Sequence, residues 1–152
     1  FNHLFTYLDI PNIARDRESL FESELLRCLE YIKTIEEVNE TDFIFGIIDE
    51  LFTGTNPNEA IATSYSICEY LSNSNNSLNI ITTHFTELTN LEKDYPNNFK
   101  NMQFKVIEND DGTFYRPYLI EEGKSEQHIA IKLLKNKGYN NSIIDRALSL
   151  VK

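Results

Sequence analysis

The first hundred residues alternate between short apolar runs and longer amphipathic stretches. Residues 43–48 form a run of Ile and Phe that only Gly46 interrupts, and residues 78–82 form a second run. Both runs are typical of strands in the parallel sheet of an α/β protein, and we expect the strand at 43–48 to be buried on both faces. Residues 1–10 predict one further strand, which Pro11 ends.

Two helices are predicted between these strands, because apolar residues recur there at helical spacing. Ser19 and Glu22 form a capping-box pattern at the start of the first helix, and Asn56 and Pro57 suit the start of the second. The expected apolar face of the first helix comprises Leu20, Phe21, Leu25, Cys28, Leu29, Ile32 and Ile35. That of the second helix comprises Ile61, Tyr65, Cys68 and Leu71.

The last third of the chain carries a hairpin pattern followed by two helical stretches. Residues 102–108 alternate, residues 109–112 read Asn-Asp-Asp-Gly, and residues 113–120 supply the returning strand. We expect this antiparallel pair to border the parallel sheet. Helices are predicted over residues 125–137 and from residue 140 or 141 onward.

The first long apolar run ends in two adjacent carboxylates, Asp49 and Glu50. Because an unpaired buried charge is costly, both acids are expected where the strand emerges, at the carboxyl edge where open α/β sheets bind ligands. In a Walker B element, the first acid holds Mg²⁺ and the second orients and deprotonates the water that attacks a γ-phosphate. The plainer interpretation is that the strand has reached solvent. The turn of Thr53, Gly54 and Thr55, with a capped helix after it, favours the Walker B interpretation.

Three segments of the chain resemble the ATPase domain of the MutS family. Residues 49–60, Asp-Glu-Leu-Phe-Thr-Gly-Thr-Asn-Pro-Asn-Glu-Ala, resemble its Walker B and D-loop segment, in a form closer to divergent branches such as those of large DNA viruses than to the standard bacterial mismatch sensor. Residues 80–88, Ile-Ile-Thr-Thr-His-Phe-Thr-Glu-Leu, resemble its strand-to-histidine segment. Its Phe-Thr … Ser-Thr-Phe-x-x-Glu stretch is matched by Leu4-Phe5-Thr6, Ser19, Phe21 and Glu24. The resemblance covers nearly the whole chain.

The resemblance implies an α/β P-loop NTPase fold of the ABC type, with a mainly parallel sheet, flanking helices and a helical pair at the end. It implies ATP and Mg²⁺ as ligands, and hydrolysis at composite sites of a homodimer or a MutS-like heterodimer. The implied site residues are Glu50 and His84 for catalysis, Asp49 for Mg²⁺, directly or through water, and Ser19, Thr53, Gly54 and Thr55 for the nucleotide.

Two of these residues also have plainer interpretations. Ser19 is either a helix cap alone or, with the N–H groups of the helix start, part of an anion site. The resemblance implies that it reaches the γ-phosphate bound by the opposite subunit. His84 is either an ordinary residue after a strand or a donor to a γ-phosphate oxygen, and its distance from Glu50 cannot be derived from the sequence.

No Gly-x-x-x-x-Gly-Lys-Ser/Thr loop occurs in the sequence. Gly123-Lys124-Ser125 copies only the end of such a loop, because Tyr118 stands where the first glycine is required. We therefore interpret residues 1–124 as the carboxyl-terminal part of an ATPase domain that lacks its first βα unit, the Walker A unit. Residues 125–152 are interpreted as a helical extension of the dimerisation type. The complete protein is expected to be a Mg²⁺-dependent ATPase, and this segment alone is expected to be inactive.

The implied function is ATP hydrolysis that drives the recognition and repair of mismatched or branched DNA. Two alternatives remain open: another ABC-like ATPase of DNA repair or chromosome organisation, and a non-catalytic interaction module that retains the fold.

Composition and charge narrow the expected partners. The formal net charge is −10 and no basic stripe occurs, so this segment alone is not expected to bind DNA well. The resemblance implies that DNA contacts come from domains outside this chain. No apolar run approaches the roughly 18 residues of a membrane span, and we expect an intracellular protein with no membrane partner. Cys28 and Cys68 lack metal-ligand spacing and are expected to be reduced core residues.

Overall fold

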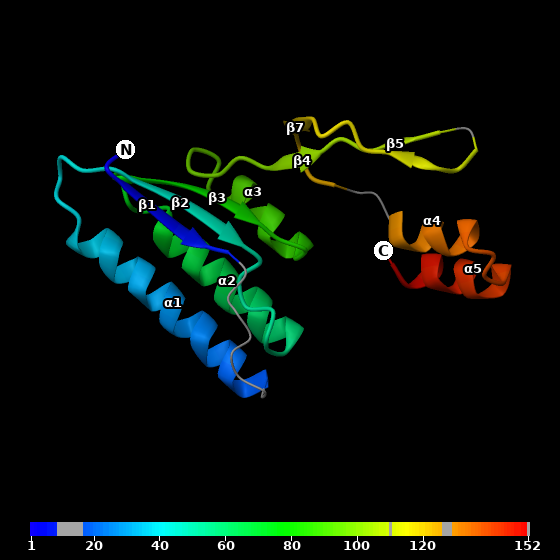
Figure 1. Cartoon of the computed structure of the whole chain (residues 1–152), viewed down its shortest axis with the longest axis horizontal. Coiled ribbons are helices and arrows are strands. Elements are labelled where there is room, and N and C mark those ends of the chain that lie inside the picture. Colours follow the sequence, from blue (N-terminus) through cyan, green and yellow to red (C-terminus); the bar gives the residue numbers. More distant parts are fainter. Residues whose placement is uncertain (9–16, 110, 126–128, 152) are drawn as a thin grey trace. The chain divides into compact units, whose positions relative to one another are not determined.

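The structure, a computed structural model, describes residues 1–8, 17–109, 111–125 and 129–151 (Figure 1). The chain folds into two compact units, which comprise residues 1–99 and residues 100–152.

The first unit contains a three-stranded parallel sheet in the order β1-β2-β3 (Figure 1). Its strands are β1 (His3–Tyr7), β2 (Ile44–Asp49) and β3 (Ser77–Thr82). In the register of the sheet, Gly46 lies between Phe5 of β1 and Asn79 of β3. The central place of β2 in this sheet confirms the parallel strand predicted at residues 43–48.

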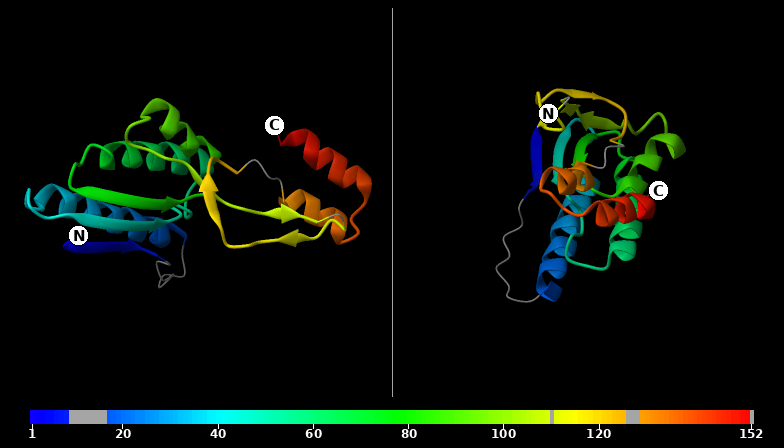
Figure 2. Two further views of the ribbon diagram at one scale, coloured as in Figure 1. Left: turned by 90° about the horizontal axis from the view of Figure 1, so that it is seen from above. Right: turned by 90° about the vertical axis from the view of Figure 1, so that its right-hand side faces the viewer.

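Two helices, α1 (Arg17–Glu37) and α2 (Pro57–Leu71), lie on the same side of this sheet (Figures 1 and 2). They connect β1 to β2 and β2 to β3, as the order of elements requires for parallel neighbours. Ile44 and Ile48 of β2 point to this side and are buried. The core of the first unit therefore lies between the sheet and the two helices.

Within the described part of the first unit, the other face of the sheet is uncovered, and we call it the open face. The expectation that β2 is buried on both faces is therefore wrong. Phe45 and Ile47 on this face are only half-buried, and Leu4, Leu78 and Ile80 beside them are between 53% and 59% exposed. Both faces of β2 are apolar. The pattern of apolar residues could not distinguish the covered face from the open one.

The core closes around Gly46. Tyr31 of α1 stacks on Phe5 with ring centroids 4.0 Å apart, and its hydroxyl donates a hydrogen bond to Asn79. A Cβ atom at residue 46 would lie 2.2 Å from Asn79 Oδ1 and 2.3 Å from Tyr31 Oη. Only glycine leaves room for this hydrogen bond in the middle of the sheet.

The buried side of α1 agrees in part with the predicted apolar face, since Cys28 is buried and Phe21, Ile32 and Ile35 pack against the core. Glu24, Cys28 and Tyr31 are at most 3% exposed, whereas Leu25 and Leu29 are 39% and 46% exposed. The buried residues keep helical spacing, but two of the three have polar groups. Because hydrophobic patterning does not select a glutamate or favour a tyrosine, it missed Glu24 and Tyr31 and assigned the exposed Leu25 and Leu29 to the buried side.

The start of α2 confirms the predicted cap. The Asn56 side chain accepts a hydrogen bond from the Asn58 N–H at 2.9 Å, and Pro57 begins the helix. Cys68 of α2 and Cys28 of α1 are both buried free thiols, as expected. Burial raises the pKa of Cys28 to about 11 and that of Cys68 to about 12.

After β3, the first unit ends in a 3-10 helix, η1 (Thr86–Asn90), and a short helix, α3 (Leu91–Asp94). Leu88 and Leu91 from these helices are buried in the core. No helix in the described part of the chain is long and apolar enough to span a membrane.

The second unit begins with an interrupted hairpin. Its strands are β4 (Met102–Phe104), β5 (Ile107–Glu108), β6 (Phe114–Tyr115) and β7 (Ile120–Glu122). The antiparallel pairs β5-β6 and β4-β7 confirm the predicted hairpin. Within the described residues, these pairs are sheets of their own rather than an edge of the parallel sheet, contrary to expectation.

Two helices, α4 (Ile129–Asn136) and α5 (Asn141–Leu150), complete the second unit and confirm the predicted helical pair. Gly138 follows α4 with φ +80°, a left-handed conformation that glycine adopts without strain. The Asn140 side chain accepts a hydrogen bond from the Ser142 N–H at 2.9 Å and caps α5. Residues 126–128 of the predicted helix lie outside the described residues. The functional boundary between residues 124 and 125 stays a prediction.

Candidate functional site

The two acids lie at the carboxyl edge of the parallel sheet, where β2 and β3 end side by side. Asp49 is the last residue of β2, and its partner in the register is Thr82, the last residue of β3. The Thr82 hydroxyl donates a hydrogen bond to Asp49 Oδ1, and the Glu50 N–H donates one to the Thr82 carbonyl at 3.1 Å. Parallel pairing thus places two distant segments of the sequence at one edge.

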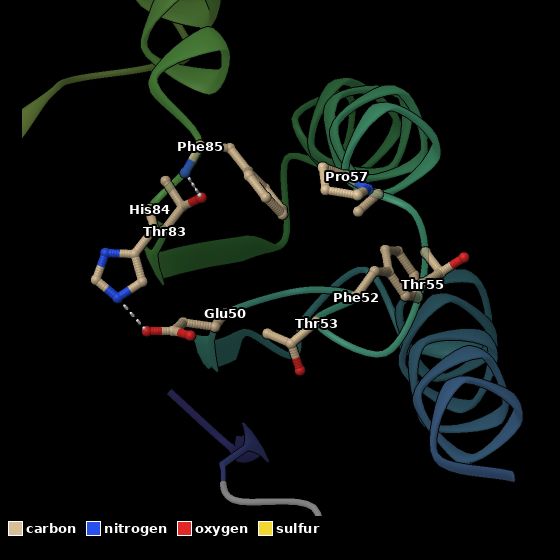
Figure 3. Close-up of a pocket in the computed structure, with 9 residues that line it drawn as sticks. Glu50, Phe52, Thr53, Thr55, Pro57, Thr83, His84 and Phe85 are labelled. Atoms are coloured by element: carbon tan, nitrogen blue, oxygen red, sulfur yellow. Dashed lines mark hydrogen bonds and ion pairs between the residues drawn. The ribbon is translucent and has the colours of Figure 1, made fainter. Parts of the chain in front are cut away.

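Glu50 meets His84 at this edge (Figure 3). The Nε2 atom of His84 lies 2.7 Å from Oε1 of Glu50, and the two side chains are 85% and 40% exposed. A carboxylate at this distance orients the imidazole ring, while the other ring nitrogen of His84 is left for a further partner. The pair remains accessible to water and to a ligand.

The turn after β2 has a strained backbone. Glu50 and Phe52 both have left-handed conformations, with φ +51° and +60°. Each such residue costs about 1–3 kcal/mol and persists only where its surroundings fix it. Phe52 is fully buried and packs edge-on against Phe21 of α1, with ring centroids 5.8 Å apart. Packing of Phe52 therefore helps to fix the direction in which Glu50 leaves the strand.

A small pocket lies beside the Glu50–His84 pair (Figure 3). Its volume is about 190 Å³, whereas pockets that hold whole small-molecule ligands measure about 300–1,000 Å³. It is lined by Glu50, Phe52, Thr53, Thr55, Pro57, Ala60, Thr83, His84 and Phe85. By itself this pocket is too small for a whole nucleotide.

Internal hydrogen bonds hold the turn of Thr53, Gly54 and Thr55. The N–H and the hydroxyl of Thr53 both donate to Glu24 Oε1 at 3.0 Å, and the Gly54 N–H donates to Glu24 Oε2 at 3.2 Å. The Thr55 hydroxyl donates to Glu59 Oε2 at 3.4 Å. Thr53 and Thr55 also line the pocket. The nucleotide contacts expected of these three residues stay predictions.

Ser19 belongs to the first turn of α1, which begins at Arg17, two residues before the expected cap. Its side chain lies outside the described residues, so both interpretations of Ser19 stay predictions. The first turn of α1 packs against Gly54, because a Cβ atom there would lie 3.2 Å from the backbone nitrogen of Phe21. The helix start that carries Ser19 is thus next to the turn that follows the acids.

The hydrogen bonds of Glu24 and Thr82 were not predicted from the sequence, although both residues lie in segments that resemble the family. Glu24 does carry a signal, since it lies at helical spacing from the buried Cys28 and Tyr31. A carboxylate on the buried face of a helix needs hydrogen-bond partners inside the protein. Thr82 carries no comparable signal, because threonine is common in strands and only the register places it beside Asp49.

The fold and the site define an α/β protein with two carboxylates and a histidine at the carboxyl edge of a parallel sheet, the place where open α/β sheets bind ligands. Its relationship to known proteins is more specific. All of the chain, residues 1–152, matches the family model of MutS domain V, and the chain belongs to this family.

The chain is also similar to the DNA mismatch repair protein MutS of several organisms. It is 29% identical to that of Fervidobacterium nodosum over 151 residues, which are 99% of this chain and 18% of that protein. MutS of Aquifex pyrophilus is 27% identical over 149 residues, 98% of this chain and 17% of that protein. MutS of Ehrlichia ruminantium is 32% identical over 120 residues, 78% of this chain and 15% of that protein. The chain thus spans less than a fifth of the length of these relatives.

Proposed function

We propose that this chain is part of a MutS-like DNA mismatch repair protein and that its carboxyl-edge site takes part in Mg²⁺-dependent ATP hydrolysis. Family membership and the similarity to DNA mismatch repair proteins support the first part. The contact of Glu50 with His84 beside Asp49 is the observation that carries the second. The proposal includes a P-loop NTPase fold of the ABC type, composite sites in a homodimer or heterodimer, and DNA contacts made by other domains.

Glu50 is the general base in this proposal. Its carboxylate takes a proton from the water that attacks the γ-phosphorus, while the bond from that phosphorus to the bridging oxygen breaks and ADP leaves. In its doubly protonated form, His84 donates from Nε2 to the Glu50 carboxylate, 2.7 Å away, and so orients it, while its other ring N–H donates to a γ-phosphate oxygen. Both side chains are exposed enough for water and nucleotide to reach them.

Asp49 fits the requirements of a Mg²⁺ ligand. It is an exposed carboxylate at a strand end, and the Thr82 hydroxyl hydrogen-bonds to it. Mg²⁺ prefers oxygen ligands and is usually bound through one or two carboxylates, with water and substrate phosphates completing its shell. When bound with nucleotide, Mg²⁺ neutralises charge on the phosphate oxygens.

The loop that cradles the phosphates is proposed to come from polypeptide other than these residues. No Gly-x-x-x-x-Gly-Lys-Ser/Thr sequence occurs in the chain, and the pocket beside Glu50 is too small for a nucleotide. The isolated chain is therefore expected to bind ATP poorly. The test belongs in the complete protein.

Glu50→Gln in the complete protein tests this proposal. The amide keeps the size of the side chain but cannot take up the proton of the attacking water. We expect ATP binding within about threefold of wild type and a fall in kcat of about 10²–10⁴-fold, the usual contribution of a positioned base. Binding of a fluorescent ATP analogue and release of phosphate measure the two quantities.

Glu40→Gln is the matched control, because Glu40 is exposed and lies before β2, at the opposite end of the strand. It should leave binding and turnover unchanged. A Glu50→Gln protein that turns over at the wild-type rate would remove Glu50 from the role of base. A wild-type protein that neither binds nor hydrolyses ATP would favour the non-catalytic interaction module.

A further inference from the structure

A buried carboxylate lies behind the turn that follows the acids. Glu24 is 3% exposed and lies on the core side of α1. It accepts hydrogen bonds from the Thr53 N–H, the Thr53 hydroxyl and the Gly54 N–H, at 3.0, 3.0 and 3.2 Å. A buried carboxylate is stable only when such donors replace water, and bonds to a charged acceptor are the stronger ones. We call Glu24, Thr53 and Gly54 the turn clasp.

The surroundings of the turn clasp leave it little freedom. Phe21, one helical turn before Glu24, packs against the fully buried Phe52. A Cβ atom on Gly54 would lie 3.2 Å from Glu24 Oε2, so the backbone approaches the carboxylate closely. Tyr7 of β1 lies near the carboxylate as well, since burial and then the charge of Glu24 raise its pKa. The strand β1, the helix α1 and the turn at residues 53–54 thus meet at Glu24.

The turn clasp is connected to Glu50 by a short, strained piece of backbone. The left-handed conformations of Glu50 and Phe52 persist only if both ends of this piece are held. At one end the Glu50 N–H is bonded to the Thr82 carbonyl, and at the other end Glu24 holds residues 53 and 54. Between these anchors, the Glu50 carboxylate is directed toward His84.

We propose that Glu24 is a positioning residue for ATP hydrolysis. This proposal rests on the proposed role of Glu50 as base. Glu24 contacts neither the nucleotide nor the attacking water. It acts by holding the turn that directs the Glu50 carboxylate. A displacement of about 1 Å in a catalytic group can cost about 10²-fold in rate without a matching loss of substrate binding. The signature of this role is a loss in kcat with little change in KM.

Glu24→Gln in the complete protein is the test. Glutamine keeps the size of the side chain but removes its charge and turns an amide N–H₂ toward the backbone donors. We expect kcat to fall at least about tenfold and KM for ATP to stay within about twofold, in keeping with a misplaced catalytic group. In hydrogen exchange, uptake should rise over residues 51–56 and stay unchanged over β2. Glu37→Gln, an exposed position in the last turn of the same helix, should alter none of these quantities.

Gly54→Ala provides a second variant, which carries the test if Glu24→Gln does not fold. Its Cβ atom would press on Glu24 Oε2 and on the Phe21 nitrogen, both at 3.2 Å, without any change of charge. The same fall in kcat is expected.

The outcomes separate the two proposals. If wild type is active and both variants keep its kcat, the role of Glu24 is overturned while that of Glu50 stands. If wild type does not hydrolyse ATP, both roles fall. A variant whose exchange rises throughout the chain, or whose KM rises as much as kcat falls, would show that Glu24 has only a structural role.

Discussion

Gly46 lies in the middle of β2, beneath the hydrogen bond that joins Tyr31 of α1 to Asn79 of β3. In the sequence it appears only as a break in an apolar run, and glycine in a strand usually weakens it. In the structure its missing side chain leaves room for two polar groups to meet inside the core. One residue thus decides how closely the sheet and α1 approach each other.

Gly46→Ala is expected to lower the free energy of unfolding by about 1–3 kcal/mol, the usual cost of inserting atoms into a packed core. The new methyl group would lie 2.2 Å from Asn79 Oδ1 and 2.3 Å from Tyr31 Oη, too close for either atom to stay in place. Urea denaturation of the chain at constant pH measures the loss.

An Asn79→Ala background provides the matched comparison for this substitution. One of the two clashing atoms is then absent, so Gly46→Ala should cost less there than in wild type. Strictly additive losses would contradict the close contact, because neighbouring residues that share an interaction are expected to couple.

Among the elements, β2 and β3 show how differently the two faces of one sheet are covered. The face toward α1 and α2 holds Ile48, which is 1% exposed, whereas Ile80 on the open face is 53% exposed. Both residues are isoleucine, so the sequence pattern predicts similar burial for the two side chains. Their expected contributions to stability differ because only one of them is removed from water.

Ile48→Ala should therefore destabilise the chain by about 2–5 kcal/mol, and Ile80→Ala by less than about 1 kcal/mol. Each is the other's control, since both remove the same atoms from neighbouring strands of the sheet. Denaturant unfolding of the two variants under the same conditions gives the comparison. Equal losses would mean that the face carrying Ile80 is covered in solution.

On the scale of the whole molecule, charge is the property that most limits the partners of the chain. The formal net charge is −10, and duplex DNA is a dense line of negative charge. Binding to DNA draws much of its free energy from Lys and Arg that replace counterions on phosphates. This chain supplies 14 such residues against 24 acidic ones.

The isolated chain is accordingly expected to show no measurable binding to duplex DNA, matched or mismatched, at about 150 mM salt. Fluorescence anisotropy of a labelled duplex measures this, and the complete protein under the same conditions is the positive control. Saturable binding by the isolated chain, weakening steeply as salt is added, would show that it contributes a basic contact surface of its own.

Local pattern was enough to predict the strands, the helices and several of their ends. The run at 43–48, the Asn56 cap with Pro57, and the start of the last helix at residue 140 or 141 each depend on residues close together in the sequence. The candidate site residues Asp49, Glu50 and His84 were likewise indicated by their positions at or just after the ends of strands. The distances between these side chains could not be predicted, because no local pattern contains the register between β2 and β3.

The sequence by itself determined the order and type of the elements and the edge at which the acids lie, since these follow from short-range periodicity and from the cost of burying charge. The tertiary structure decided what depends on residues far apart in the chain: the 2.7 Å contact of Glu50 with His84, the open face of the sheet and the burial of Glu24. In each case, the packing of one element against another places side chains that the sequence alone leaves unconnected.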